Sequence, residues 1–303
     1  MNKKGIVIKS TGSWYKVLSG DKVIDARIPG KMRLQKLEVT NPVTVGDQVD
    51  LEIQSDDTAI ISNIHLRQNY IPRSATHGRR GEQILISNVD MAWVVQSIRQ
   101  PQLKTGFIDR FLVTCEAYEV KAGVVINKTD LANKKDLAFI DDMVQLYTGL
   151  GYPVLTTSIQ DPASIENLRN ELKDRVSVFI GPSGVGKTSL LTTAEPSIER
   201  KIREVSDYSG KGKHTTTFAE LIPLESGGFL ADTPGIRELG LVNIEKAELS
   251  HYFPEMAEAG RHCKFYNCTH NHEPGCNVMD AFEKGEIHAE RYNSYLNILE
   301  SLN

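Results

Sequence analysis

The chain lacks the features that mark secreted, membrane-spanning and repetitive proteins. Its 303 residues include only four cysteines and two tryptophans. No apolar run approaches the roughly 20 residues that cross a bilayer, and residues 1–7 lack the long apolar core of a signal peptide. Internal repeats and low-complexity tracts are also absent from the sequence. These absences predict a cytoplasmic protein with no membrane partner, and the length allows two or three domains.

The few cysteines are unevenly placed. Cys115 stands alone in an amphipathic helical stretch, where we expect a small core residue. The other three cluster with histidines, and their odd number favours a metal site over disulfides. Three thiolates and one imidazole suit tetrahedral Zn²⁺, and four protein ligands would make the site structural rather than catalytic. The spacing gives Cys263, Cys268, His270 and Cys276, with His262 and His272 as spare candidates.

Acidic residues are missing from one basic stretch. The net charge of −4 argues against indiscriminate nucleic-acid binding but allows local patches. Residues 66–80 contain no acidic residue and hold Arg67, Arg73, His77, Arg79 and Arg80. We interpret residues 67–83 as a basic linker, and an RNA-facing role for it stays open.

The most informative stretch that is present is GPSGVGKTS, residues 181–189. It fits the pattern G-x-x-x-x-G-K-[ST] at every fixed position, with an apolar, β-prone run before it and a helical pattern after it. In that context backbone N–H groups point into one concavity, and the helix N-terminus adds positive charge, so the loop would hold phosphates. The loop residues predicted to bind a nucleotide are Gly181, Pro182, Ser183, Gly184, Val185, Gly186, Lys187, Thr188 and Ser189.

A second polar motif predicts which base is bound. Asn127, Lys128, Thr129 and Asp130 follow an apolar strand directly. A carboxylate here can accept hydrogen bonds from N1–H and the 2-amino group of guanine, whereas adenine would leave it unpaired. Asn127 is expected at the opposite base edge, with the Lys128 stem over the ring. Ser158 ends the next strand, where a backbone N–H would meet the 6-oxo group, although an ordinary strand-end turn is an equal alternative.

Two further motifs predict the γ-phosphate and magnesium contacts. Lys187 is expected at the terminal phosphates, and the Thr188 hydroxyl on Mg²⁺. Asp232 begins D-T-P-G, where the carboxylate would hold Mg²⁺ through water and the Gly235 N–H would sense the γ-phosphate. A glycine-rich segment between the motifs carries Thr215 and Thr216, of which we favour Thr216 to complete the magnesium shell.

The order of these motifs indicates a circular permutation. Ras-like GTPases run phosphate loop, switch threonine, D-x-x-G and then N-K-x-D, whereas here N-K-T-D comes first. The site tolerates this, because its loops all lie at one end of the sheet whichever strands are joined.

The predicted architecture has three domains. Short strands fill residues 1–66, the size of an OB-type barrel, although an SH3-like barrel would give a similar pattern. Residues 84–245 alternate strands and helices and predict an α/β P-loop GTPase domain with a parallel sheet. Residues 246–303 predict a zinc-binding helical domain with helices at 246–259 and 279–302. The strands expected in the first two domains are 5–10, 14–18, 22–28, 47–54, 59–66, 91–97, 122–126, 153–157, 176–180, 218–223 and 228–231, and the helices of the second are 108–118, 136–150 and 162–172.

With these motifs, nearly the whole chain closely resembles the ribosome small-subunit-dependent GTPase A family (RsgA, the YjeQ/YloQ type). The resemblance implies GTP hydrolysis to GDP, stimulated by the 30S subunit late in its assembly, with contacts to 16S rRNA and other assembly factors as possible partners. It also implies zinc ligation by Cys263, Cys268, His270 and Cys276. We expect a monomer.

The sequence lacks one residue that Ras-type proteins use. Ile236 stands where they carry a water-positioning glutamine, so slow intrinsic turnover and dependence on the ribosome are expected. His214 is similar to the histidine proposed for this role in the family and is our candidate. Two other functions compete with this prediction: an RNA-binding assembly scaffold with nucleotide as a structural ligand, and an ATP-using kinase.

Overall fold

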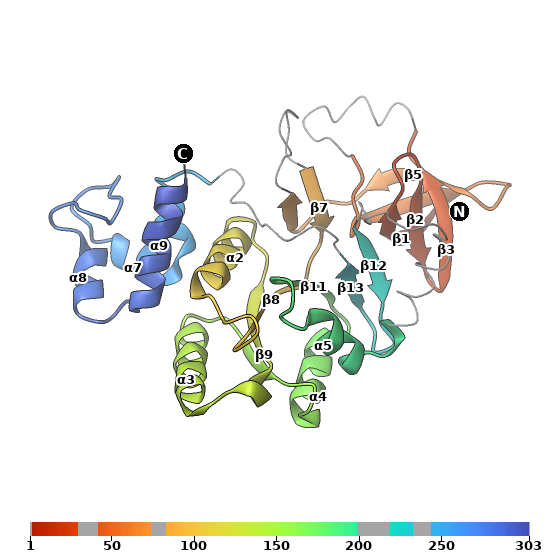
Figure 1. Cartoon of the computed structure of the whole chain (residues 1–303). Helices are drawn as coiled ribbons and strands as arrows, with labels where there is room; N and C mark the ends of the chain where they lie inside the picture. The colour runs from red at the N-terminus through yellow and green to blue at the C-terminus, as the bar shows by residue number, and fades with distance from the viewer. Residues whose placement is uncertain (1, 30–41, 74–82, 199–218, 233–243, 303) are drawn as a thin grey trace.

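The computed structural model describes residues 2–29, 42–73, 83–198, 219–232 and 244–302. Along the chain, a small β-barrel is followed by a sheet covered with helices and then by a group of short helices (Figure 1). Among the described residues, no helix is both long and apolar enough to cross a membrane.

The N-terminal strands close into a five-stranded barrel. Their order is β1-β2-β3-β5-β4, and β4 pairs again with β1. The β3–β5 pairing is parallel and the others are antiparallel. This order identifies an OB-type barrel and decides against the SH3-like alternative. Its strands are β1 (Asn2–Ser10), β2 (Tyr15–Ser19), β3 (Lys22–Arg27), β4 (Gln48–Ile53) and β5 (Ala59–Ile64).

The central sheet has the order β10-β9-β8-β11-β13-β12, in which only β12 is antiparallel to its neighbour within this set. Every residue of β8, β9 and β11 is buried, as the apolar runs predict for strands covered on both faces. The bounds are β8 (Met91–Ser97), β9 (Ala122–Asn127), β10 (Val154–Thr157), β11 (Val176–Ile180), β12 (Glu220–Pro223) and β13 (Phe229–Asp232).

Helices cover both faces of this sheet (Figure 1). Val94 and Val124 pack in one apolar cluster with residues of α2 and α3, while Val95 and Val125 pack in a second cluster with residues of α4 and α5. Neighbouring strand residues thus face opposite helix layers, as the two-residue period of a strand requires. The helices are α2 (Thr105–Ala117), α3 (Lys134–Gly149), α4 (Pro162–Leu172) and α5 (Lys187–Ala194). Cys115 lies buried in the first cluster, which confirms its predicted core position.

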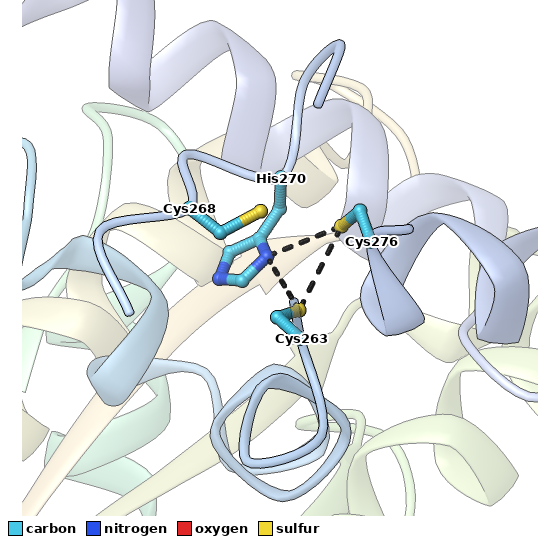
Figure 2. Close-up of side chains that lie close together, drawn as sticks. All are labelled: Cys263, Cys268, His270 and Cys276. Carbon is cyan, nitrogen blue, oxygen red and sulfur yellow. Dashed lines mark hydrogen bonds between the residues drawn. The ribbon is translucent and has the colours of Figure 1, made fainter. Parts of the chain in front are cut away.

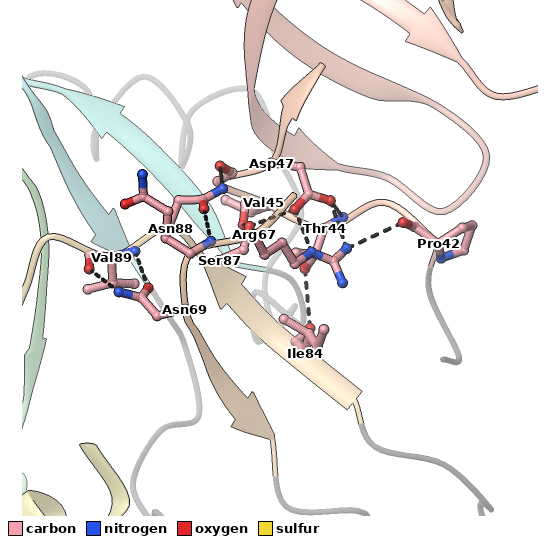
Figure 3. A network of polar contacts seen from close by, with 12 residues as sticks. Pro42, Thr44, Val45, Asp47, Arg67, Asn69, Ile84, Ser87, Asn88 and Val89 are labelled. Carbon is pink, nitrogen blue, oxygen red and sulfur yellow. Dashed lines mark hydrogen bonds and ion pairs between the residues drawn. The ribbon is translucent and has the colours of Figure 1, made fainter. Parts of the chain in front are cut away.

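A polar network joins the barrel to the segment that sequence patterns indicate as a basic linker. That stretch includes the strand β6 (Tyr70–Arg73), which pairs with β7 (Gln83–Ser87). Arg67 is not a solvated charge: its Nε and Nη2 donate to the fully buried carboxylate of Asp47 at 2.7 and 2.8 Å (Figure 3). Ser87 Oγ also donates to Asp47, at 2.7 Å. Burial of the carboxylate with this partner explains why one arginine of the basic stretch faces inward.

The C-terminal helices differ from the two long helices that the sequence predicts. Residues 246–259 contain a 3-10 turn, η2 (Leu249–Tyr252), and then α7 (Pro254–Gly260). Pro254 explains the break, because the residue before a proline avoids the helical region and Phe253 is extended. The last predicted helix is divided into α8 (Asn277–Glu283) and α9 (Ala289–Ser301), and Gly285 adopts φ +76° between them.

A buried ion-pair cluster fixes α9 against the central domain. Arg291 Nη1 lies 2.7 Å from Asp109 Oδ1 of α2, and its Nε lies 2.7 Å from Glu255 Oε1 of α7. Tyr147 of α3 donates to the same Asp109 oxygen at 2.9 Å, and the guanidinium lies 4.4 Å from the centre of the Phe253 ring. Burial alone would lower the pKa of Arg291, but the charges of Asp109 and Glu255 outweigh burial and raise it. The cluster therefore joins four helices, α2, α3, α7 and α9, around one permanently charged side chain.

Candidate functional site

The phosphate loop follows β11 and leads into α5, as predicted. Gly186 precedes the helix with φ +90°, and a Cβ atom there would lie 2.6 Å from Asn127 Nδ2. Only glycine fits both the backbone angle and this close approach. Lys187 Nζ donates to the carbonyls of Gly181 and Pro182 at 2.7 and 2.9 Å, so the lysine folds over its own loop.

The structure brings N-K-T-D against this loop although the two motifs are far apart in the chain. Asn127 Nδ2 donates to the Val185 carbonyl at 2.9 Å. Lys128 Nζ donates to the Gly184 carbonyl at 2.6 Å and to the Gln100 carbonyl at 2.5 Å. The two motifs thus meet at one corner, at the carboxyl ends of β9 and β11. Gln100 belongs to no recognised motif, so its contact with Lys128 could not be predicted from the sequence.

Asp130 is exposed at the same corner, and the residue that follows β10 orients its carboxylate. Ser158 Oγ donates to Asp130 Oδ1 at 2.6 Å, and Thr157 Oγ1 donates to Asn127 Oδ1 at 2.9 Å. The Ser158 N–H, a candidate for the 6-oxo contact, donates to Ser164 Oγ at 3.1 Å. Ser158 therefore contacts Asp130 through its hydroxyl rather than through its backbone N–H. Thr129 Oγ1 donates to the Thr157 carbonyl at 3.2 Å and completes the link between the two strands.

Asp232 and Thr188 lie on the same cavity, of about 140 Å³, together with Lys187. A hydroxyl and a carboxylate beside a phosphate loop are the hard oxygen donors that Mg²⁺ prefers, so these residues fit the ion. Partial burial and the neighbouring charge of Glu220 raise the pKa of Asp232, whereas Lys9 lowers it.

Gly235, His214, Thr215 and Thr216 lie outside the described residues, and their roles stay predictions.

The predicted metal ligands converge. The ligand atoms of Cys263, Cys268, His270 and Cys276 all lie within 4.8 Å of one another (Figure 2). Cys263 Sγ lies 3.9 Å from Cys276 Sγ, and a tetrahedral ion with Zn–S bonds of about 2.3 Å separates two sulfurs by about 3.8 Å. His270 Nδ1 lies 3.3 Å from Cys276 Sγ and 3.6 Å from Cys263 Sγ. His262 and His272, the spare candidates, are not members of this cluster.

The loop that carries His270 is fixed from two sides. The Glu273 carboxylate accepts hydrogen bonds from the Thr269 N–H at 2.8 Å and from two further backbone N–H groups. From α9, Tyr292 Oη donates to the His270 carbonyl at 2.8 Å, and Tyr295 Oη donates to the Thr269 carbonyl at 2.6 Å. Such outer contacts orient metal ligands before the ion arrives.

Burial shifts the protonation preferences of Cys268, Cys276 and His270. It raises the pKa of the Cys268 thiol to about 12 and also raises that of Cys276. The same burial lowers the pKa of His270, which favours the neutral imidazole that a metal needs. A bound divalent cation reverses the preference of the thiols by coordinating thiolates. The donor set and its spacing fit Zn²⁺.

Loss of one thiol should remove the metal and the order of its loop. We expect Cys276→Ser to weaken zinc binding by more than about 100-fold, because it removes a ligand rather than an outer contact. Zinc content after dialysis against a chelator and hydrogen exchange of residues 263–276 measure this. His272→Gln is the matched control, because His272 is exposed and outside the cluster. Full zinc retention by Cys276→Ser would contradict the assignment.

The fold and the order of the site loops along the chain define the class of protein. The base motif after β9 precedes the phosphate loop after β11 in the chain, yet both lie at one corner of the sheet. This is a circularly permuted P-loop GTPase, with a barrel before it and, after it, a module that carries the cluster of three cysteines and one histidine. Family models agree: RsgA GTPase matches residues 64–242, and the RsgA N-terminal domain matches residues 4–61. The chain belongs to the RsgA GTPase family.

Several relatives match this chain along nearly its whole length. The small ribosomal subunit biogenesis GTPase RsgA of Phocaeicola vulgatus is 45% identical over 298 residues, which cover 98% of this chain and 96% of the relative. The protein of that name from Flavobacterium psychrophilum is 44% identical and covers 98% of this chain and 92% of its own. Among solved structures, YjeQ from Thermotoga maritima matches with a TM-score of 0.82 at 34% identity, covering 100% of this chain and 99% of its own. YloQ, described as a circularly permuted GTPase, matches with a TM-score of 0.79 at 33% identity, covering 100% of this chain and 95% of its own.

Proposed function

We propose that the chain hydrolyses GTP to GDP and phosphate when stimulated by the 30S ribosomal subunit, late in assembly of that subunit. The observation that supports the proposal is the contact of Asn127 and Lys128 with the phosphate loop, because it brings a guanine-type base motif next to a phosphate-binding motif. The names of the relatives supply the ribosomal context. Contacts with 16S rRNA and with other assembly factors, a monomeric state and a cytoplasmic location belong to the same proposal.

Each part of the site has a role in this reaction. Asp130, oriented by Ser158, accepts the N1–H and 2-amino hydrogens of guanine, while Asn127 serves the opposite base edge. The loop from Gly181 to Ser189 donates backbone N–H groups to the phosphates. Lys187 leaves its carbonyl partners and meets the terminal phosphates.

The remaining roles concern the γ-phosphate. Thr188, Asp232 and Thr216 would hold Mg²⁺, which would neutralise charge on the β- and γ-phosphates. The Gly235 N–H detects the γ-phosphate, and His214 positions the attacking water in place of a glutamine. Zn²⁺ at the cysteine cluster maintains the C-terminal module and takes no part in the chemistry.

Phosphate release from GTP, measured with and without purified 30S subunits, tests the proposal. We expect slow release by the chain alone and acceleration of about tenfold or more by the subunits, because groups supplied by a partner accelerate GTPases strongly. Lys187→Ala should abolish release under both conditions. Subunit binding without accelerated release would favour the RNA-binding scaffold, and equal use of ATP would favour the kinase.

A further inference from the structure

A lysine of the barrel reaches the edge of the nucleotide-binding sheet. The last part of β1 pairs with β12, and the register places Lys9 opposite Glu220. Their side chains form an ion pair, with Lys9 Nζ 2.7 Å from Glu220 Oε2. The lysine is 26% exposed and the glutamate 23%, so the pair is largely shielded from water. Through the pairing of β1 with β12, the strands of the barrel and of the central sheet form one continuous sheet of eleven described strands.

The same register continues to the predicted magnesium ligand. Glu220 is directly opposite Asp232 in the antiparallel pair of β12 and β13. Residues directly opposite in such a pair lie on one face, with Cβ atoms about 4.5–5.5 Å apart. Two carboxylates in this position repel each other unless a cation lies between or beside them. Lys9, Glu220 and Asp232 therefore form a row across three strands that ends at the cavity lined by Lys187 and Thr188.

We propose that Lys9 is a positioning residue for the divalent cation of the nucleotide site. By engaging Glu220, it leaves Asp232 as the single carboxylate that faces the cation beside Thr188. Without Lys9, the two opposed carboxylates form a competing divalent-cation site at the end of β13. The inference rests on the proposed assignment of Asp232 to Mg²⁺ and extends it to a residue outside the nucleotide-binding motifs.

This arrangement makes the nucleotide site depend on the barrel. Lys9 belongs to a strand that also pairs with β2 and β4 of the barrel. Its charge reaches Glu220 only while the β1–β12 junction is formed. A partner that displaces the barrel would therefore release Glu220 toward the cation corner.

Titration of Mn²⁺ into the full-length, zinc-loaded, nucleotide-free protein, followed by electron paramagnetic resonance, tests the inference. Lys9→Met should bind Mn²⁺ roughly fivefold more tightly than the wild type, because an unpaired second carboxylate joins Asp232. Lys9→Arg should match the wild type. In Lys9→Met/Glu220→Gln the affinity should return to the wild-type value, because the pair is again neutral in sum. Equal affinities of Lys9→Met and the wild type, or no restoration in the double variant, would overturn the inference.

If Lys9→Met does not fold, a second variant that keeps the lysine tests the inference. Glu220→Gln leaves the lysine charge uncompensated beside Asp232, so Mn²⁺ binding should weaken roughly threefold; unchanged binding would overturn the inference. Wild-type GDP affinity measured with and without Mg²⁺ separates this result from the proposed function. Failure of Mg²⁺ to tighten GDP binding would contradict the magnesium site itself, whereas Mg²⁺-dependent binding with no Lys9 effect would contradict only the inference.

Discussion

Asp130→Asn should lose GDP affinity by about 100-fold or more, because two hydrogen bonds from guanine to a charged carboxylate are replaced by contacts with an amide (about 3 kcal/mol). The same variant should bind xanthosine diphosphate better than the wild type does, by roughly tenfold or more, because an amide N–H can donate to the 2-oxo group of xanthine. Competition with a fluorescent nucleotide measures both affinities.

The control for this exchange is Asp141→Asn, an identical substitution at an exposed position of α3 away from the base corner. It should leave both affinities unchanged. Ser158→Ala should have a smaller effect in the direction of Asp130→Asn, because it removes only the hydroxyl that orients the carboxylate. Unchanged nucleotide preference in Asp130→Asn would exclude Asp130 as the group that reads the base.

Arg291→Ala should destabilise the protein by about 3–5 kcal/mol, the range for removing one partner of a buried ion pair. The guanidinium is 1% exposed, and its loss leaves the fully buried Asp109 carboxylate without a counter-charge. Because the pair joins α9 to α2, the C-terminal helices should separate from the central domain before global unfolding. Urea denaturation and hydrogen exchange in α9 measure the two effects.

Arg261→Ala is the matched control in the same module. Its ion pair with Glu258 is 70% and 67% exposed, and such surface pairs contribute less than about 1 kcal/mol. Pairing Arg291→Met with Asp109→Asn should recover part of the lost stability, because the fully buried Asp109 charge is then removed and only the less buried Glu255 carboxylate has lost its partner. Similar stability losses in Arg261→Ala and Arg291→Ala would contradict the importance given to the buried cluster.

Much of the fold could be predicted from local patterns. The bounds of β8, α4 and β11 agree with the predicted ranges, because each is a periodic or apolar run with turn residues at both ends. Asp161 caps α4 and Pro162 follows it, a start signal that is visible in the sequence. The convergence of Cys263, Cys268, His270 and Cys276 was equally predictable, because the four residues lie within one short segment.

Other features were hidden because they depend on distant parts of the chain. The pairing of Lys9 with Glu220 joins residues 211 positions apart, and no local pattern indicates it. The prediction of two long C-terminal helices was wrong, because the apolar periodicity continues through Pro254 and Gly285, where the backbone turns. The inward position of Arg67 depends on Asp47, which lies 20 positions earlier, in the barrel.

The central claim is that the base motif, which precedes the phosphate loop in the chain, forms one guanine-nucleotide site together with that loop. A structure of the protein with GDP and Mg²⁺ bound tests this claim most directly. The account predicts guanine with its N1–H and 2-amino group on the Asp130 carboxylate, phosphates in the loop from Gly181 to Ser189, and Mg²⁺ beside Thr188. A base bound away from Asp130, with phosphates in the loop, would contradict it.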